Sequence, residues 1–74
     1  MKLRVKLDEV LKARGNMSQK ELAELTGIRP AAISELYNNQ RKSINREHIE
    51  KIAEKLNITE ISEIIELVDD GQAK

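Results

Sequence analysis

The 74-residue chain contains no cysteine, a single aromatic residue and no long apolar run. Without cysteine it can form neither a disulfide nor a thiolate metal site, and this composition fits a reducing compartment such as the cytoplasm. No apolar segment approaches the ~20 residues of a membrane-spanning helix. The first ten residues alternate charged and apolar side chains and lack the apolar segment of a signal peptide. We therefore expect a cytoplasmic protein that has no membrane partner.

The chain also lacks the residue combinations of an active site. Its one histidine, His48, has no cysteine or second histidine with which to hold a metal ion. No phosphate-binding glycine loop, Ser-His-acid combination or cofactor motif is present. A chain of this size buries only about 60% of the surface that it exposes when unfolded, which leaves little room for a deep substrate cavity. We expect no enzymatic activity, no catalytic residue, no cofactor and no metal.

Charge is balanced overall but unevenly distributed along the chain. The net charge is zero, yet residues 1–46 carry a balance of +5 and residues 47–74 a balance of −5. This asymmetry predicts one basic working surface and one acidic surface. The sequence pI of about 6.6 is below the value above about 9 that marks a strongly nucleic-acid-binding domain, so charge alone leaves the function open.

Apolar spacing and capping signals predict an all-α protein, a compact bundle of five short helices. We expect one domain over residues 1–74, with a core at about 7–68 and a frayed tail at 69–74. Alternation of charged and apolar residues in 2–6 indicates a short extended lead-in. A first helix is then expected at about 6–14.

The next two helices are marked by residues with known positional preferences. Ser18 and Glu21 form a capping-box pattern at the start of the second helix, and Gly27 is expected to end it in a left-handed conformation. Pro30 suits the first turn of a third helix, which runs to about Tyr37. Two short helices joined by a tight glycine-containing turn are typical of a helix-turn-helix unit, whose second helix enters the major groove of DNA.

Two more helices are expected in the acidic half. Asn45 is a candidate N-cap for the fourth helix, and Thr59 for the fifth. The apolar stripe of the fourth comprises Ile49, Ile52, Ala53 and Leu56. The apolar stripe of the fifth comprises Ile61, Ile64, Ile65 and Val68. Any part of this second stripe that the small bundle leaves uncovered would be a dimer surface.

Three segments in fixed order resemble the Cro/C1-type (XRE, phage-repressor-like) helix-turn-helix family: SQKELAELTGI, AISELYNNQRKSI and IEKIAEKLNI. The resemblance covers about residues 7–68. It implies a lambda-repressor-like domain that binds double-stranded DNA sequence-specifically, with a recognition helix at about 29–38 in the major groove. It also implies a repressor-like bacterial or phage transcriptional regulator.

The resemblance assigns DNA-facing roles to ten residues. Gln19 would bond a phosphate and brace the recognition helix, and Asn38 would meet a phosphate at that helix's end. The positions that would face base edges are Arg29, Ala31, Ala32 and Glu35. The loop that would follow the DNA backbone or approach the minor groove holds Asn39, Gln40, Arg41 and Lys42.

Simpler roles remain open for several of these side chains. The alternative role of the two alanines is that of good helix formers, and the alternative role of Glu35 is an ion pair with a nearby cation. For the whole chain, the alternative to DNA binding is an antitoxin-like interaction module that uses the acidic C-terminal half to hold a basic protein. A homodimer and a protein partner are compatible with both readings.

Overall fold

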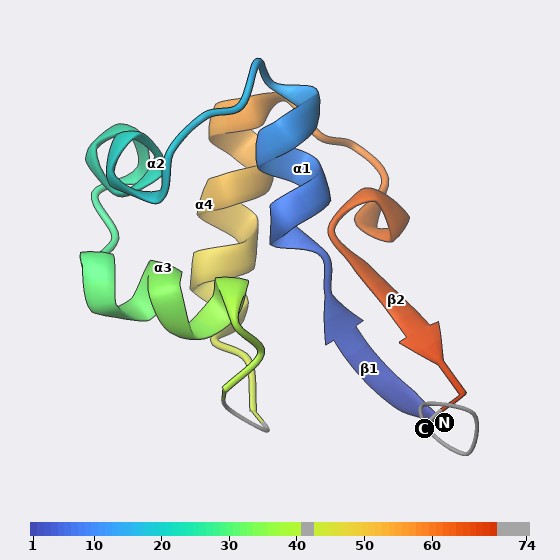
Figure 1. Ribbon diagram of the computed structural model, residues 1–74. Coiled ribbons are helices and arrows are strands. Elements are labelled where there is room, and N and C mark those ends of the chain that lie inside the picture. Colours follow the sequence, from blue (N-terminus) through green and yellow to red (C-terminus); the bar gives the residue numbers. More distant parts are fainter. Residues whose placement is uncertain (41–42, 70–74) are drawn as a thin grey trace.

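The structure, a computed structural model, describes residues 1–40 and 43–69 of the chain (Figure 1). A two-stranded antiparallel sheet, the β-ribbon, joins the two ends of a mostly helical domain. In chain order the elements are β1 Lys2–Val5, α1 Leu7–Ala13, α2 Gln19–Thr26, α3 Pro30–Tyr37, α4 Arg46–Leu56, the 3-10 turn η1 Ile61–Glu63 and β2 Ile65–Val68. Figure 1 shows α2 and α3 on one side of α4 and the β-ribbon on the other.

The prediction of an all-α bundle of five helices is wrong, because the segment expected to form the fifth helix folds differently. It forms η1 and then β2, which pairs with β1. Thr59 caps no helix, and the residue before η1 is Glu60, without a side-chain cap. A helix of about ten residues is marginal in water, whereas isoleucine and valine suit a strand once a partner strand is available. The extended lead-in expected at 2–6 provides that partner.

The apolar stripe expected along the fifth helix is therefore divided between environments. Ile64 is fully buried, whereas Ile61 is 53% exposed. In the strand, Ile65 and Val68 are only partly buried. A helical spacing of apolar residues was present, but pairing between residues far apart in the sequence decided the conformation.

The β-ribbon is closed by an ion pair between its two strands. The register places Arg4 opposite Glu66, and the Arg4 Nη1 donates to Glu66 Oε2 at 2.7 Å. The Arg4 Nη2 also donates to both carboxylate oxygens of Asp8 in α1, at 3.1 Å. The hydrogen bond to Glu66 raises the pKa of Arg4 above its ordinary value. One side chain thus links both strands to α1.

One apolar core holds the helices and the β-ribbon together. Its largest fully buried side chains come from all four helices and from the residue before β2: Leu7, Leu22, Ile33, Ile52 and Ile64. Val5 of β1 joins the same cluster. The contribution of each helix is one stripe of apolar residues, as the helical spacing in the sequence indicates.

The caps expected for the second and fourth helices are confirmed. Ser18 Oγ accepts from the Glu21 N–H at 3.0 Å, and the Glu21 carboxylate accepts from the Ser18 N–H at 2.8 Å. Asn45 Oδ1 accepts from the Glu47 N–H at 2.8 Å at the start of α4. Gly27 ends α2 with φ of 76°. Local sequence signals therefore set the boundaries of α2, α3 and α4.

Gly15 and Gly27 make a matched pair for testing backbone strain, since both have φ of 76° and an added Cβ would meet nothing within 4 Å at either. We expect Gly15→Ala and Gly27→Ala each to lower the free energy of unfolding by about 1 kcal/mol, because alanine is strained in the left-handed region. Urea denaturation of both variants measures this effect. Unchanged stability in either would contradict the backbone conformation described.

Candidate nucleic-acid interface

The turn between α2 and α3 is fixed by a buried threonine. Thr26 is the one buried polar side chain among the described residues; its hydroxyl donates to the Leu22 carbonyl at 2.8 Å and accepts from the Ile28 N–H at 3.2 Å. Gly27 then reverses the chain in its left-handed conformation. The role of Thr26 is not among the sequence-based predictions, although a threonine directly before a helix-ending glycine is a detectable signal for such a turn.

The inner face of α3 is anchored on α2. Ala23 is buried at 5% exposure and is small, which lets the two helices pack closely. Ile28 and Ile33 lie in the core cluster directly before and within α3, and Leu36 joins it one turn later. The outer face of α3 is therefore held in place from beneath and remains at the surface.

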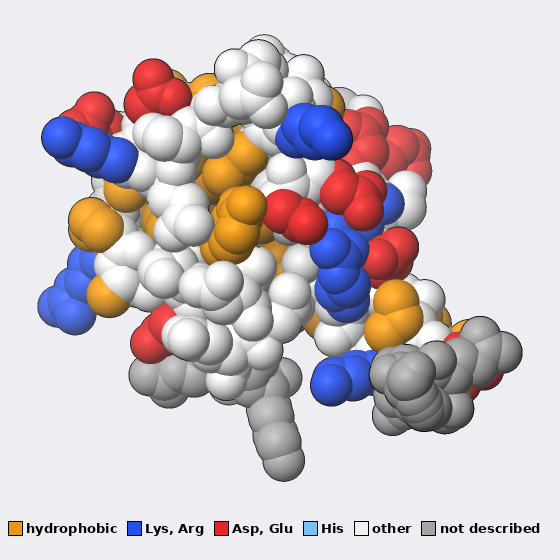
Figure 2. Space-filling view, viewed as in Figure 1, with side chains coloured by type: hydrophobic (Ala, Val, Ile, Leu, Met, Phe, Trp, Pro, Cys, Tyr) orange, Lys and Arg blue, Asp and Glu red, His pale blue; other side chains and the backbone are white. Residues whose placement is uncertain are grey.

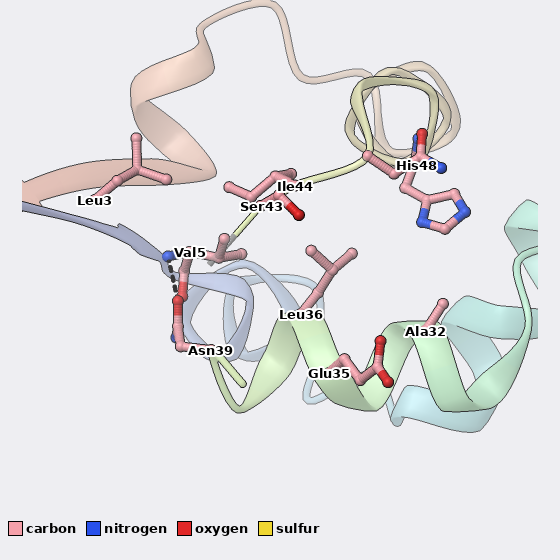
Figure 3. Close-up of a pocket in the computed structure, with 10 residues that line it drawn as sticks. Leu3, Val5, Ala32, Glu35, Leu36, Asn39, Ser43, Ile44 and His48 are labelled. Atoms are coloured by element: carbon pink, nitrogen blue, oxygen red, sulfur yellow. Dashed lines mark hydrogen bonds between the residues drawn. The ribbon is translucent and has the colours of Figure 1, made fainter. Parts of the chain in front are cut away.

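The four residues expected to face bases divide into two pairs. Arg29, the N-cap residue of α3, and Ala31 in its first turn are both exposed. Ala32 and Glu35 are partly buried and line a hollow of about 330 Å³ beside α4. Figure 3 shows both side chains on the side of α3 that faces His48. The structure thus places Arg29 and Ala31 at the exposed N-terminal end of α3. It places Ala32 and Glu35 on the side of α3 that faces α4.

The two residues expected to bond phosphates lie at helix ends. Gln19 is the first residue of α2 and is half-buried. It lines a second hollow of about 570 Å³, together with Lys12 and Tyr37. Asn38 follows α3 and is exposed; its Nδ2 donates to the Ser34 carbonyl at 3.0 Å. Both positions border the unit formed by α2 and α3.

Asn39 has a structural role that the sequence did not reveal. Its Oδ1 accepts from the Val5 N–H at 2.7 Å, and its Nδ2 donates to the Val5 carbonyl at 3.0 Å (Figure 3). The side-chain amide thus pairs with β1 as a neighbouring strand would. Asn39 adopts φ of 54°, a conformation that asparagine tolerates better than most residues. It ties the end of α3 to the β-ribbon.

The rest of the expected DNA-facing loop is described only in part. Gln40 is exposed, and its N–H donates to the Glu35 carbonyl at 3.0 Å. Arg41 and Lys42 lie outside the described residues. Figure 2 shows a surface that is mainly white over α3, whereas blue and red side chains lie close together near the base of the β-ribbon. The exposed face of α3 is therefore mostly uncharged.

Two further kinds of site were looked for among the described residues, a metal-binding cluster and a membrane-spanning helix. Among residues 1–40 and 43–69, no group of three or more histidine, aspartate or glutamate side chains is placed to hold a metal ion. Within the same part of the chain, no helix has the length and apolar character needed to cross a membrane.

The Asn39 amide pair can be tested by changing Asn39 to glycine, which tolerates the positive φ and so removes only the amide. We expect Asn39→Gly to lower the free energy of unfolding by about 1–2 kcal/mol, because two hydrogen bonds are lost. Asn38→Ala is the control and should change stability by less than about 0.5 kcal/mol, since its bonds are exposed. Equal losses in thermal or urea unfolding would argue against the pairing with Val5.

Comparison with known proteins agrees with this geometry. A family model described as Cro/C1-type HTH (helix-turn-helix) DNA-binding domain matches residues 6–70. Comparisons with curated proteins and with solved structures gave no significant match. The matched range contains α2, α3 and the turn between them, and this family is a DNA-binding, regulatory kind of domain and not an enzyme family. The chain belongs to the Cro/C1-type helix-turn-helix DNA-binding domain family.

Proposed function

We propose that the protein is a sequence-specific regulator of transcription, repressor-like and of bacterial or phage type, that places α3 in the major groove of double-stranded DNA. The observation that carries the proposal is the presentation of α3. Its inner face is fixed by Ile33 and Leu36, while Arg29 and Ala31 are exposed at its first turn. In helix-turn-helix proteins the N-terminal residues of the second helix contact base edges.

Base reading in this proposal depends on few side chains. Arg29 has the length and the donor geometry to bond guanine O6 and N7, and the methyl group of Ala31 suits the methyl group of thymine. Pro30, between them, has no N–H to donate. A small, uncharged outer face lets the backbone of α3 approach the groove closely. The preference for a DNA sequence then also depends on the shape and deformability of the duplex, which differ between sequences and need no hydrogen bond to a base.

Backbone contacts in this proposal surround the reading helix. Gln19 and Asn38 lie at the ends of α2 and α3, and Gln40 lies in the loop that follows α3. Polar side chains at such positions bond phosphates and set the orientation of the protein on the duplex. Arg41 and Lys42 remain sequence-based assignments for the same task.

The alternative of an acidic protein-binding surface gains no specific support. The exposed residues of α4 include three acidic and three basic side chains: Arg46, Glu47, Glu50, Lys51, Glu54 and Lys55. Glu66 in β2 is already paired with Arg4. The exposed surface of α4 therefore carries no net negative charge.

The proposal predicts different effects for two exposed cations. In binding assays on a duplex selected from a random pool, Arg29→Ala should weaken binding by about 1–3 kcal/mol and relax the preference at one base position. Lys55→Ala, in the last turn of α4, is the matched control and should leave that preference unchanged. An equal loss on every sequence would assign Arg29 to phosphate, and failure to select any duplex would overturn the proposal.

A further inference from the structure

A hollow of about 330 Å³ lies where α3, β1 and the start of α4 come together. Figure 3 shows α3 along one side of the hollow, the start of α4 along the other and β1 at one end. Ligand sites in proteins have volumes from about 300 Å³ upward, so the hollow has room for one small molecule. Because its walls come from distant parts of the sequence, no local pattern indicates it.

The floor of the hollow is apolar. Val5 and Leu36 line it and belong to the buried core, with exposed fractions of 3% and 9%. Ile44 also lines it and packs against that core from the loop before α4. The transfer of a short aliphatic chain from water onto such a surface is favourable, because apolar area is buried. The floor therefore suits the aliphatic part of a ligand.

Two asparagines hold the walls of the hollow in place. The Asn39 side chain exchanges two hydrogen bonds with the backbone of Val5, at 2.7 and 3.0 Å, which tie the end of α3 to β1. Asn45 Oδ1 accepts from the Glu47 N–H at 2.8 Å and caps α4. Both asparagines line the hollow, and their side-chain bonds lie within the protein. The walls are thus pre-formed, so a ligand loses little binding energy in ordering them.

Three other polar side chains face the hollow. Figure 3 shows the Glu35 carboxylate on the side of α3, and the Ser43 hydroxyl and the His48 imidazole on the side of α4. Within the part of the chain that the structure describes, neither the Ser43 hydroxyl nor the His48 imidazole has a hydrogen-bond partner. A hydroxyl oxygen and one nitrogen of a neutral imidazole are acceptors. With the carboxylate, they present three acceptors to the same hollow.

The charge of the lining determines the class of ligand. Glu35 is the one described lining side chain with a formal charge when His48 is neutral. A carboxylate attracts a cation, repels an anion and forms stronger hydrogen bonds with a charged donor than with a neutral one. A bare metal ion does not fit, because a zinc site takes at least three protein ligands and no such group exists among the described residues. The ligand class that fits is an organic cation.

We propose that the hollow binds a small aliphatic ammonium ion, a primary amine in its protonated form. An ammonium group has three N–H donors and no acceptor, which matches the three acceptors of Glu35, Ser43 and His48. The aliphatic chain of the ligand then lies on Leu36 and Ile44, where it is removed from water. This inference goes beyond the proposed DNA binding and does not depend on it, so it is tested on the full chain without DNA.

The first measurement is a titration of the isotope-labelled chain with hexylammonium, followed by amide chemical shifts. We expect saturable shifts centred on residues 32–39 and 43–48, with a dissociation constant on the order of 1 mM for so small a ligand. Hexanol and hexanoate are the matched probes, because they keep the aliphatic chain but carry no charge and the opposite charge, respectively. Each should bind at least roughly tenfold more weakly.

Two variants test the roles assigned to the lining. Glu35→Gln keeps the shape of the side chain but removes its charge, so it should weaken hexylammonium binding by about fivefold or more. Glu24→Gln is the matched control, because it removes an exposed carboxylate from α2; its dissociation constant should not change. Ala32→Leu places a larger side chain in the hollow and should also weaken binding. Circular dichroism verifies that all three variants are folded.

Three outcomes would each overturn the proposal: shifts that stay linear with concentration, hexanol or hexanoate binding as tightly as hexylammonium, or Glu35→Gln binding as tightly as the unchanged chain. The result is separable from the DNA proposal. A chain that fails these tests but selects a duplex from a random pool overturns the ammonium site alone. A chain that binds hexylammonium but selects no duplex overturns the DNA proposal alone.

Discussion

Pairing between the two ends of the chain supports the rest of the structure. β1 and β2 are about 60 residues apart in sequence, and the Arg4–Glu66 bond at 2.7 Å closes them into a β-ribbon. That pairing carries Val5 and Ile64 into the core beside the helices. Closing so long a loop costs conformational entropy, and the buried apolar contacts at its base offset that cost. The β-ribbon therefore depends on the core for its stability, and it contributes Val5 to that core.

The helix proposed to read DNA is held at both ends by contacts of different kinds. At its start, the Thr26 hydroxyl and the left-handed Gly27 fix the turn from α2. After its end, the Asn39 amide pairs with Val5 of β1. The second contact connects the surface proposed for DNA with the β-ribbon.

Sequence patterns predicted the local elements better than the topology. The capping box at Ser18, the turn at Gly27 and the Asn45 cap depend on residues within a few positions of one another, and all three are confirmed. The segment from Ile61 to Val68 has apolar residues at helical spacing, but it forms a 3-10 turn and a strand. Its conformation depends on β1, at the other end of the chain, and no local pattern contains that information.

The candidate site shows the same division. The sequence by itself determined the helix-turn-helix unit, the small outer face of α3 and the family, because glycine, proline and capping residues act through short-range backbone preferences. Only the tertiary structure decided that Ala32 and Glu35 flank a hollow, that Asn39 binds Val5, and that Leu3 meets Leu67 on an uncovered face. Each of these outcomes is a contact between segments that are far apart in the sequence. Such contacts depend on how the whole chain packs, and short-range backbone preferences do not determine them.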